Sequence, residues 1–172
     1  LEYFDGNQYV NITTDSPEQN TGGTRGLIMG GITSGRTNLV TFITINTTGD
    51  AADFGDLVQT SSQGAGLGSR TRAVAGGGTP SSPGGTNNID FHEFASTGTF
   101  NDFGDMNPTG FARIAVASST RGVFMGRAVA PNAYNEIEFV TIASTGNSKD
   151  FGDLTDERHT GGAAGNATRG IY

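Results

Sequence analysis

The chain lacks cysteine and contains a single lysine, Lys149. Without cysteine, neither disulfides nor thiolate-bound metals can stabilise the fold, and the redox compartment stays undetermined. Lys and Arg number 10 against 17 Asp and Glu, which gives a formal net charge of −7. Because nucleic acids and anionic membranes bind clustered basic side chains, we expect neither as a partner. An apolar run of about 18 residues is also missing, so we expect no membrane insertion.

Glycine, in contrast, is abundant, with 28 of 172 residues, and only 16% of the residues are charged. The 11 Phe residues and many Val and Ile recur between the glycines, which is typical of short strands joined by tight turns. No 3.6-residue apolar stripe is sustained, so the sequence predicts an all-β fold. The chain begins with Leu1 and shows no signal-peptide pattern, and we expect a processed or truncated product.

The chain is built from a repeat whose units begin at a Thr-Arg pair. The pairs start at Thr24, Thr71, Thr120 and Thr168, with spacings of 47, 49 and 48 residues. This divides the chain into an N-terminal β segment and linker (1–23), three units (24–70, 71–119 and 120–167) and a fourth start or closing strand (168–172). A period of 40–50 residues with several short strands per unit indicates a stacked or radial β-architecture.

An aromatic strand recurs in every unit with apolar residues two positions apart. Its two apolar columns are Val40, Ile89 and Ile137, and then Phe42, Phe91 and Phe139. Period-2 alternation places both columns on one buried face. The residues between the columns are Thr41, Asp90 and Glu138, and we expect them on a solvated opposite face.

The motif Asp-Phe-Gly-Asp follows this strand in each unit, at 53–56, 102–105 and 150–153. A protein kinase carries Asp-Phe-Gly once, together with other motifs that this chain lacks, so a structural role is favoured. Phe54, Phe103 and Phe151 are expected to fill the core, and the glycines to permit a sharp bend. The aspartates are expected to cap that bend and the repeated arginines to pair with them. The alternative is one Ca²⁺ per motif, although two carboxylates fall short of the oxygens that Ca²⁺ requires.

These units resemble the kelch repeat, in which an apolar strand ending in glycines ("LIMGG", "AVAGGG") precedes an aromatic strand. Residues 135–170 and the opening 1–17 are similar to kelch-like repeat proteins of marine bacteriophages (cyanophage type), found in tail fibres and appendages. The resemblance implies four-stranded propeller blades and a virion structural or receptor-binding component without catalytic residues. In its departures from the kelch pattern, this chain has Phe where kelch repeats carry Tyr and Trp.

Three units plus a partial fourth pose a problem of closure, because propellers have about four to eight blades. The ends of the chain could complete a fourth blade, or several chains could share a ring. The alternative fold is a three-fold β-prism or trefoil-like body. In either case we expect a homo-oligomer or other virion chains as partners.

Recognition is expected where the units differ, in the loops between the first two strands of each unit. The candidate ligand-binding residues are Arg36, Arg127 and Tyr134, since Arg and Tyr are typical interface anchors. The expected partner is a host-surface glycan or protein, and the expected location is the virion. A purely architectural decoration or connector protein is the alternative function.

An enzyme is the minor alternative, in the form of a glycan depolymerase that uses Glu93 beside His92 together with a second carboxylate. His92 and His159 occupy unmatched repeat positions, so we expect no metal site. No Ser/His/Asp constellation and no phosphate-binding loop are evident. We therefore expect no catalytic residues and no cofactor.

Overall fold

A computed structural model describes residues 2–4, 9–11, 23–80, 84–166 and 168–172. In this part of the chain every regular element is a β-strand. The first two strands, β1 (Glu2–Phe4) and β2 (Tyr9–Asn11), pair with each other as a separate antiparallel hairpin. The described residues contain no helix long and apolar enough to cross a bilayer.

The other strands form four antiparallel sheets, numbered here in chain order. Sheet 1 contains β3 (Arg25–Ile32), β4 (Arg36–Thr44) and β5 (Ala52–Asp56). Sheet 2 contains β6 (Ala65–Gly68), β7 (Arg72–Gly76), β8 (Thr86–Glu93) and β9 (Asn101–Gly110). Sheet 3 contains β10 (Ile114–Ala117), β11 (Arg121–Val129), β12 (Asn132–Thr141) and β13 (Lys149–Asp153). Sheet 4 contains β14 (Ala164–Gly165) and β15 (Gly170–Ile171).

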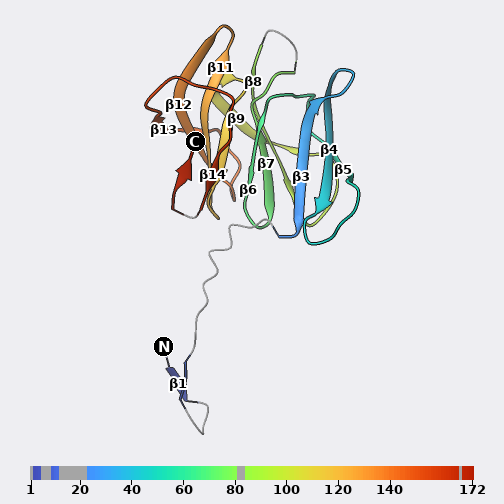
Figure 1. The fold of residues 1–172 in the computed structure, drawn as a ribbon, viewed down its shortest axis with the longest axis vertical. Helices are drawn as coiled ribbons and strands as arrows, with labels where there is room; N and C mark the ends of the chain where they lie inside the picture. The colour runs from blue at the N-terminus through green and yellow to red at the C-terminus, as the bar shows by residue number, and fades with distance from the viewer. Residues whose placement is uncertain (1, 5–8, 12–22, 81–83, 167) are drawn as a thin grey trace.

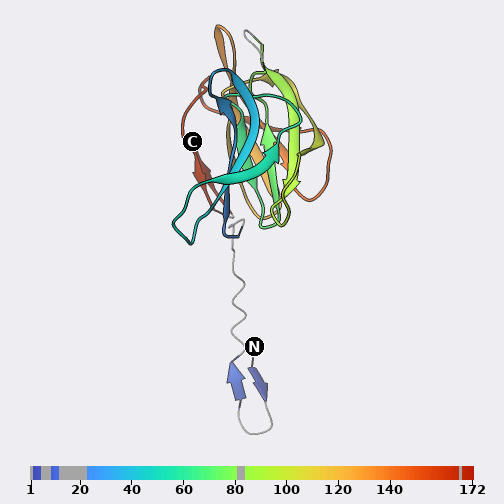
Figure 2. The ribbon, with the colours of Figure 1, turned by 90° about the vertical axis from the view of Figure 1, so that its right-hand side faces the viewer.

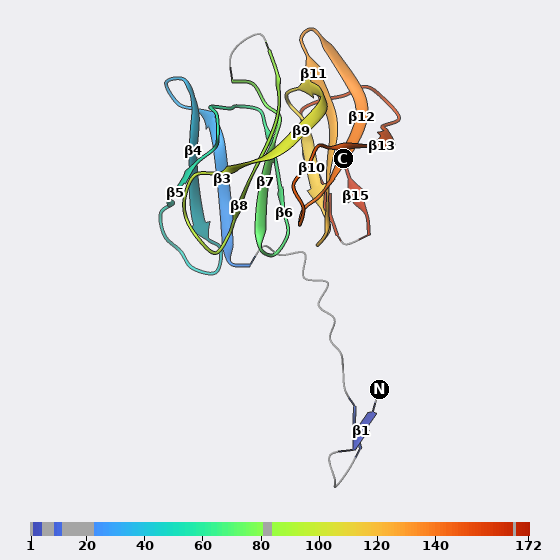
Figure 3. The same ribbon diagram turned by 180° about the vertical axis from the view of Figure 1, so that it is seen from behind.

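Sheets 1, 2 and 3 stand side by side in chain order, as Figures 1 and 3 show from opposite sides. Within each sheet the strands also follow chain order, so consecutive strands pair antiparallel with each other. Sheets 2 and 3 each begin a few residues before a Thr-Arg pair, because the Gly/Ala-rich end of one sequence unit supplies the first strand of the next sheet. Sequence units and sheets are therefore offset by one strand.

The core lies between neighbouring sheets. Between sheets 1 and 2 it consists of Val40, Phe54, Leu57, Ala73 and Phe100. Between sheets 2 and 3 it consists of Ala65, Val74, Ile89, Phe103, Met106, Phe124, Val140 and Ile142. Sheet 2 therefore buries one face against sheet 1 and the other against sheet 3.

Four of the six predicted core phenylalanines belong to the two core clusters or pack against them, and Phe139 lies outside both clusters. Phe54 and Phe103 are buried, and Phe42, Phe91 and Phe139 are half-buried. Each strand Phe meets the Phe of the next strand edge-on, with ring centroids 5.8–6.1 Å apart. Phe151 is 52% exposed, and its assignment to the core is wrong. No complete sheet follows sheet 3 to cover it in the described part of the chain.

The Asp-Phe-Gly-Asp motifs form the outer strands β5, β9 and β13, each with a β-bulge at the motif. Gly55, Gly104 and Gly152 adopt φ of 143°, 144° and 137°, which confirms the predicted bend. Asp102 and Asp150 accept hydrogen bonds from the N–H of the glycine two residues on, at 3.2 and 3.1 Å, which confirms their capping role.

The bulged strand also joins neighbouring sheets through backbone hydrogen bonds. Gly98 N–H donates to Phe54 O and Gly146 N–H donates to Phe103 O, both at 2.7 Å. Phe100 N–H to Asp56 O (2.7 Å) and Ser148 N–H to Asp105 O (2.9 Å) repeat the pattern two residues on. A turn of each following sheet thus docks onto the outer strand of the sheet before it.

The repeated arginines act differently from the prediction. Arg25, Arg72 and Arg121 lie over the rings of Phe42, Phe91 and Phe139, with 4.5–5.0 Å between guanidinium carbon and ring centroid. The first two also reach the next sheet: Arg25 Nη1 donates to Phe94 O (2.6 Å) and Arg72 Nη1 donates to Ile142 O (2.9 Å). Within the described ranges no ion pair joins them to the motif aspartates, so that pairing was predicted wrongly.

Candidate functional site

The predicted recognition residues lie at or near two hairpin tips at one end of the sheets, those of β3–β4 and β11–β12 (Figure 1). Both turns are shorter than expected, with residues 33–35 and 130–131 between the strands. Arg36 begins β4, is half-buried, and its Nε donates to Ser62 Oγ at 3.2 Å. It lies in sheet 1, whereas Arg127 and Tyr134 lie in sheet 3, so only the last two form a pair.

Arg127 and Tyr134 are register partners on β11 and β12. The guanidinium carbon of Arg127 lies 3.8 Å from the ring centroid of Tyr134. Its Nη2 pairs with Glu136 Oε1 at 2.9 Å, and its Nη1 donates to Thr109 O at 3.3 Å. Arg127 is therefore a buried strand residue whose Nη1 and Nη2 are engaged while its buried Nε has no hydrogen-bond partner, and not the free loop side chain that the sequence predicted.

A second buried ion pair lies beside it, between Arg113 and Glu138. Arg113 Nη1 lies 2.7 Å from Glu138 Oε2, and Arg113 Nη2 donates to Pro108 O at 2.6 Å. Burial lowers the pKa of Arg113, and the charge of Glu138 opposes that shift. Glu138 Oε1 in turn accepts from Asn107 N–H (2.9 Å) and from the Ser148 hydroxyl (2.6 Å). Through these bonds to Pro108 and Asn107 of β9, the pair connects sheet 3 to sheet 2.

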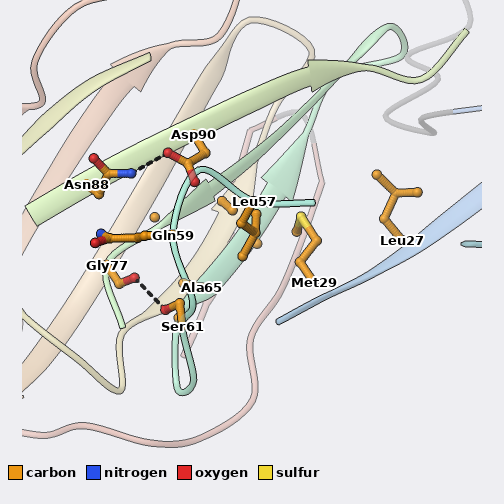
Figure 4. Close-up of a pocket in the computed structure, with 13 residues that line it drawn as sticks. Leu27, Met29, Leu57, Gln59, Ser61, Ala65, Gly77, Asn88 and Asp90 are labelled. Carbon is orange, nitrogen blue, oxygen red and sulfur yellow. Dashed lines mark hydrogen bonds between the residues drawn. The ribbon is translucent and has the colours of Figure 1, made fainter. Parts of the chain in front are cut away.

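The matching place between sheets 1 and 2 is a pocket of about 220 Å³ (Figure 4). Leu27, Met29 and Leu57 come to it from sheet 1 and the segment that follows it, and Asn88 and Asp90 come from β8. In Figure 4, Asp90, Asn88 and Gln59 lie along one side, and Leu27 and Met29 lie on the other. The remaining lining residues are Ser61, Gly64, Ala65, Gly66, Ala75, Gly76 and Gly77.

Asp90 is the ionisable group of this pocket, and only 4% of it is exposed. Its Oδ2 accepts from Val58 N–H at 3.0 Å, and its Oδ1 accepts from the Asn88 amide. Burial raises its pKa to about 6, against the lowering effect of the Val58 bond, and Asp102 adds a smaller rise. Within the described ranges no Arg, Lys or His pairs with it. The Asp90 carboxyl group is thus buried beside the pocket and has no cationic partner among the described residues.

Asp90 and Glu138 correct the prediction that their strand face is solvated, since Glu138 is only 3% exposed. The alternation in the sequence is real, but the polar face of β8 and of β12 packs on the preceding sheet. From the sequence, charged residues at these positions predicted exposure to solvent. Their burial follows from the packing of one sheet on the next, which the sequence does not show.

The histidines do not form a metal site. His92 is half-buried, with its ring 5.2 Å from that of Phe54 and 5.5 Å from that of Phe100, so it packs into the first sheet interface. His159 is exposed. Glu93 pairs with Arg72 at 2.9 Å. The described residues contain no group of three His, Asp or Glu side chains placed to hold a metal ion.

No protein-family model matches the chain, and no curated protein matches it. Among solved structures it is similar to that of YjhT, a kelch-repeat β-propeller protein, with a TM-score of 0.62 at 11% sequence identity. The fold resembles a kelch propeller. The match covers 74% of this chain but 42% of YjhT, so the chain spans less than half the length of that propeller.

The kelch-like fold confirms the predicted all-β class and blade-type sheets. The three-fold prism, the alternative prediction, is not the arrangement that the structure resembles. Sheets 2 and 3 are full four-stranded blades, whereas sheet 1 has three strands and sheet 4 has two. Of the segments expected to close a ring, β1 pairs with β2 and β15 pairs with β14. The described residues therefore form an open array of kelch-like sheets.

Proposed function

We propose that the chain is a non-enzymatic structural and receptor-binding module of a virion appendage, of the tail-fibre kind, whose kelch-like sheets associate with further copies of the chain. The observation that carries this proposal is the open face of sheet 1. Ile28 is 51% exposed, Ile43 40% and Ile45 63%. Figure 2 views the molecule from this side, with sheet 1 toward the viewer.

The repeat identifies what should cover this face. The counterparts of the three isoleucines are Ala75, His92 and Phe94 in sheet 2, and Phe124, Val140 and Ile142 in sheet 3. All six pack against the sheet before them or are buried at that interface. The isoleucines therefore stand where a preceding sheet would contact them. Burying them would contribute about 25 cal/mol per Å² of apolar surface.

The other half of such an interface lies at the opposite end of the array. Phe151 is 52% exposed and the space around Gly152 is open, so β14 and β15 leave the outer strand β13 uncovered. Phe54 and Phe103, its counterparts, accept hydrogen bonds from Gly98 and Gly146. Gly49 is the corresponding residue of sheet 1, and in a second copy it can donate to Phe151 O. Arg121 likewise corresponds to Arg25 and Arg72, and Ile45 O of the second copy is its acceptor.

This association is head-to-tail, so repeated contacts lead to a ring or a filament. A net charge of −7 per chain opposes it, and we expect assembly to strengthen as salt screens the repulsion. The hairpin tips of β3–β4 and β11–β12 stay free at one end, where Arg36 and Tyr134 would serve recognition of a host-surface glycan or protein.

Assembly is tested by sedimentation of the whole chain and of the variants Ile28→Lys and Phe151→Glu. Each variant blocks one half of the interface, so each alone should be monomeric. An equimolar mixture should form heterodimers, because each variant retains the half that the other has lost. A wild-type chain that stays monomeric at high salt and high concentration contradicts the proposal. Self-association of both single variants contradicts it as well.

Recognition is tested on a glycan array with Arg36→Ala and Tyr134→Ala, using circular dichroism to verify folding. Loss of binding in folded variants supports a receptor-binding role. Unchanged binding, or assembly without any glycan or cell binding, favours the architectural virion protein. Release of reducing ends from polysaccharide would overturn the non-enzymatic assignment.

A further inference from the structure

Two carboxylates hold the same place at successive sheet interfaces. Asp90 on β8 accepts from Val58 N–H at 3.0 Å, and Glu138 on β12 accepts from Asn107 N–H at 2.9 Å. Val58 and Asn107 each follow an Asp-Phe-Gly-Asp motif by the same number of residues. The two acids are therefore structural counterparts, and the surroundings of one can be compared directly with those of the other.

The two interfaces differ in the cation. Glu138 is paired with the buried guanidinium of Arg113, which also donates to Pro108 O. Gly64 occupies the repeat position of Arg113 and follows Phe54 as Arg113 follows Phe103, without insertions or deletions between. The backbones correspond there as well, since Gln63 and Ala112 both have positive φ, at 57° and 55°. Where one interface has a guanidinium, the other has a glycine beside an open pocket.

We propose that the pocket at Asp90 binds a guanidinium group supplied from outside the chain. The pocket has a volume of about 220 Å³, and both Asp90 and Gly64 line it. Asp90 is ionisable, nearly fully buried and unpaired with any cation of the described residues. A buried carboxylate without a counter-charge is unfavourable, so a cation that pairs with Asp90 removes this cost, less the cost of its own desolvation.

The walls favour guanidinium over a metal ion or an ammonium. Leu27 and Met29 present apolar surface, which suits the weakly hydrated flat faces of a guanidinium and not a strongly hydrated ion. Gln59 lines the pocket at the repeat position of Pro108, whose carbonyl accepts from Arg113, so we expect the Gln59 carbonyl to serve as a second acceptor. A metal ion would need several more oxygen ligands than one carboxylate provides.

The guanidinium can come from a free alkylguanidine or from an arginine side chain of a bound protein. The pocket is distinct from the hairpin tips and from the open faces of sheets 1 and 3, so this inference does not depend on the proposed function. Binding requires the ionised carboxylate. It should therefore weaken as the pH falls through about 6, where Asp90 becomes protonated. Asp102 is the other acid that acts on Asp90, and it also favours a cation there.

The test is an NMR titration of the ¹⁵N-labelled chain with methylguanidinium chloride at millimolar concentration and neutral pH, followed at the Val58 amide. Saturable shifts of Val58 are expected in the wild type. Asp90→Asn should weaken the apparent affinity by about tenfold or more, because the charge-assisted contact is lost. Asp50→Asn, which removes an exposed carboxylate, is the matched control and should bind like the wild type.

A second variant tests the comparison between the two interfaces. Gly64→Arg places a guanidinium at the repeat position of Arg113. The space around Gly64 can accept a side chain, because the nearest atom to an added Cβ is Gly77 O, at 3.3 Å. This variant should fold and no longer bind methylguanidinium. The inference is overturned if Asp90→Asn binds like the wild type, or if methylammonium chloride shifts Val58 with equal affinity. An arginine-containing peptide that binds while methylguanidinium also binds points to a protein partner, and a peptide that fails to bind points to a free small molecule.

Discussion

The guanidinium of Arg127 lies over the ring of Tyr134, 3.8 Å from its centroid, while its Nη2 pairs with Glu136. Arg127→Met keeps much of the apolar volume but leaves Glu136 without its cation. Because the Glu136 side chain is 33% exposed, we expect a loss of about 2 kcal/mol in the free energy of unfolding, less than for a fully buried pair. Urea denaturation measures it. Arg127→Lys should recover only part of the loss, since an ammonium lacks the flat face; full recovery would contradict a stacking role.

Phe103 and Phe151 occupy the same repeat position but differ in burial. Phe103→Ala should cost about 3–5 kcal/mol, because it opens a cavity between sheets 2 and 3. Phe151→Ala should cost about 1 kcal/mol or less in the monomer, since Phe151 is half exposed. Thermal unfolding of the two variants in parallel measures both. Equal losses would mean that Phe151 is covered in solution.

Gly104 and Gly152 offer a matched pair for backbone docking. Both have positive φ, so alanine strains each by about 1–3 kcal/mol. A Cβ at Gly104 would also lie 2.6 Å from the Gly146 carbonyl, whereas nothing lies within 4 Å at Gly152. Gly104→Ala should therefore be clearly less stable than Gly152→Ala. Their chemical denaturation midpoints measure the difference, and coincident midpoints would exclude tight docking of the turn.

Asp90 predicts how stability depends on pH. Its pKa is raised in the fold to about 6 from 3.8, so the folded chain binds this proton more tightly than the unfolded chain. The proton on Asp90 therefore contributes fully to the free energy of unfolding below about pH 3.8. This contribution, about 3 kcal/mol, is lost as the pH rises through about 6. Asp90→Asn lacks this titration.

Urea midpoints of wild type and Asp90→Asn across this range provide the measurement. The variant should gain relative to the wild type between the two pKa values and hold a constant advantage above them. All other carboxylates are common to both proteins and cancel in the comparison. Parallel curves would show that Asp90 titrates normally.

The sequence predicted the strands, the repeat and the glycine bends, because period-2 alternation and positive-φ glycines are local properties. Phe54 and Phe103 were found for the same reason. The burial of Asp90 and Glu138 was missed, since alternation shows which residues share a face but not what covers that face. Phe151 was misplaced because the repeat treats all units as equal, whereas no complete sheet covers Phe151 in the part of the chain that the structure describes.

Arg127 and the pocket illustrate a second limit. Arg127 stands where the first unit has Gly31, but only the cross-strand register shows that it stacks on Tyr134. One available signal was overlooked. Aligning the units places Gly64 opposite Arg113, and an arginine that is present at one interface and missing at the next indicates either a changed charge or an empty space.

The turn-to-strand bonds between sheets, such as Gly98 to Phe54 and Gly146 to Phe103, involve main-chain atoms only. These bonds do not depend on which side chains face one another between the sheets. Residues as different in size as Ala75 and Phe124 occupy one repeat position at the two interfaces, while the same turn-to-strand bonds form at both. In repeats of this kind, the side chains within each sheet interface can differ in chemistry while the backbone contacts between the sheets are conserved from one interface to the next.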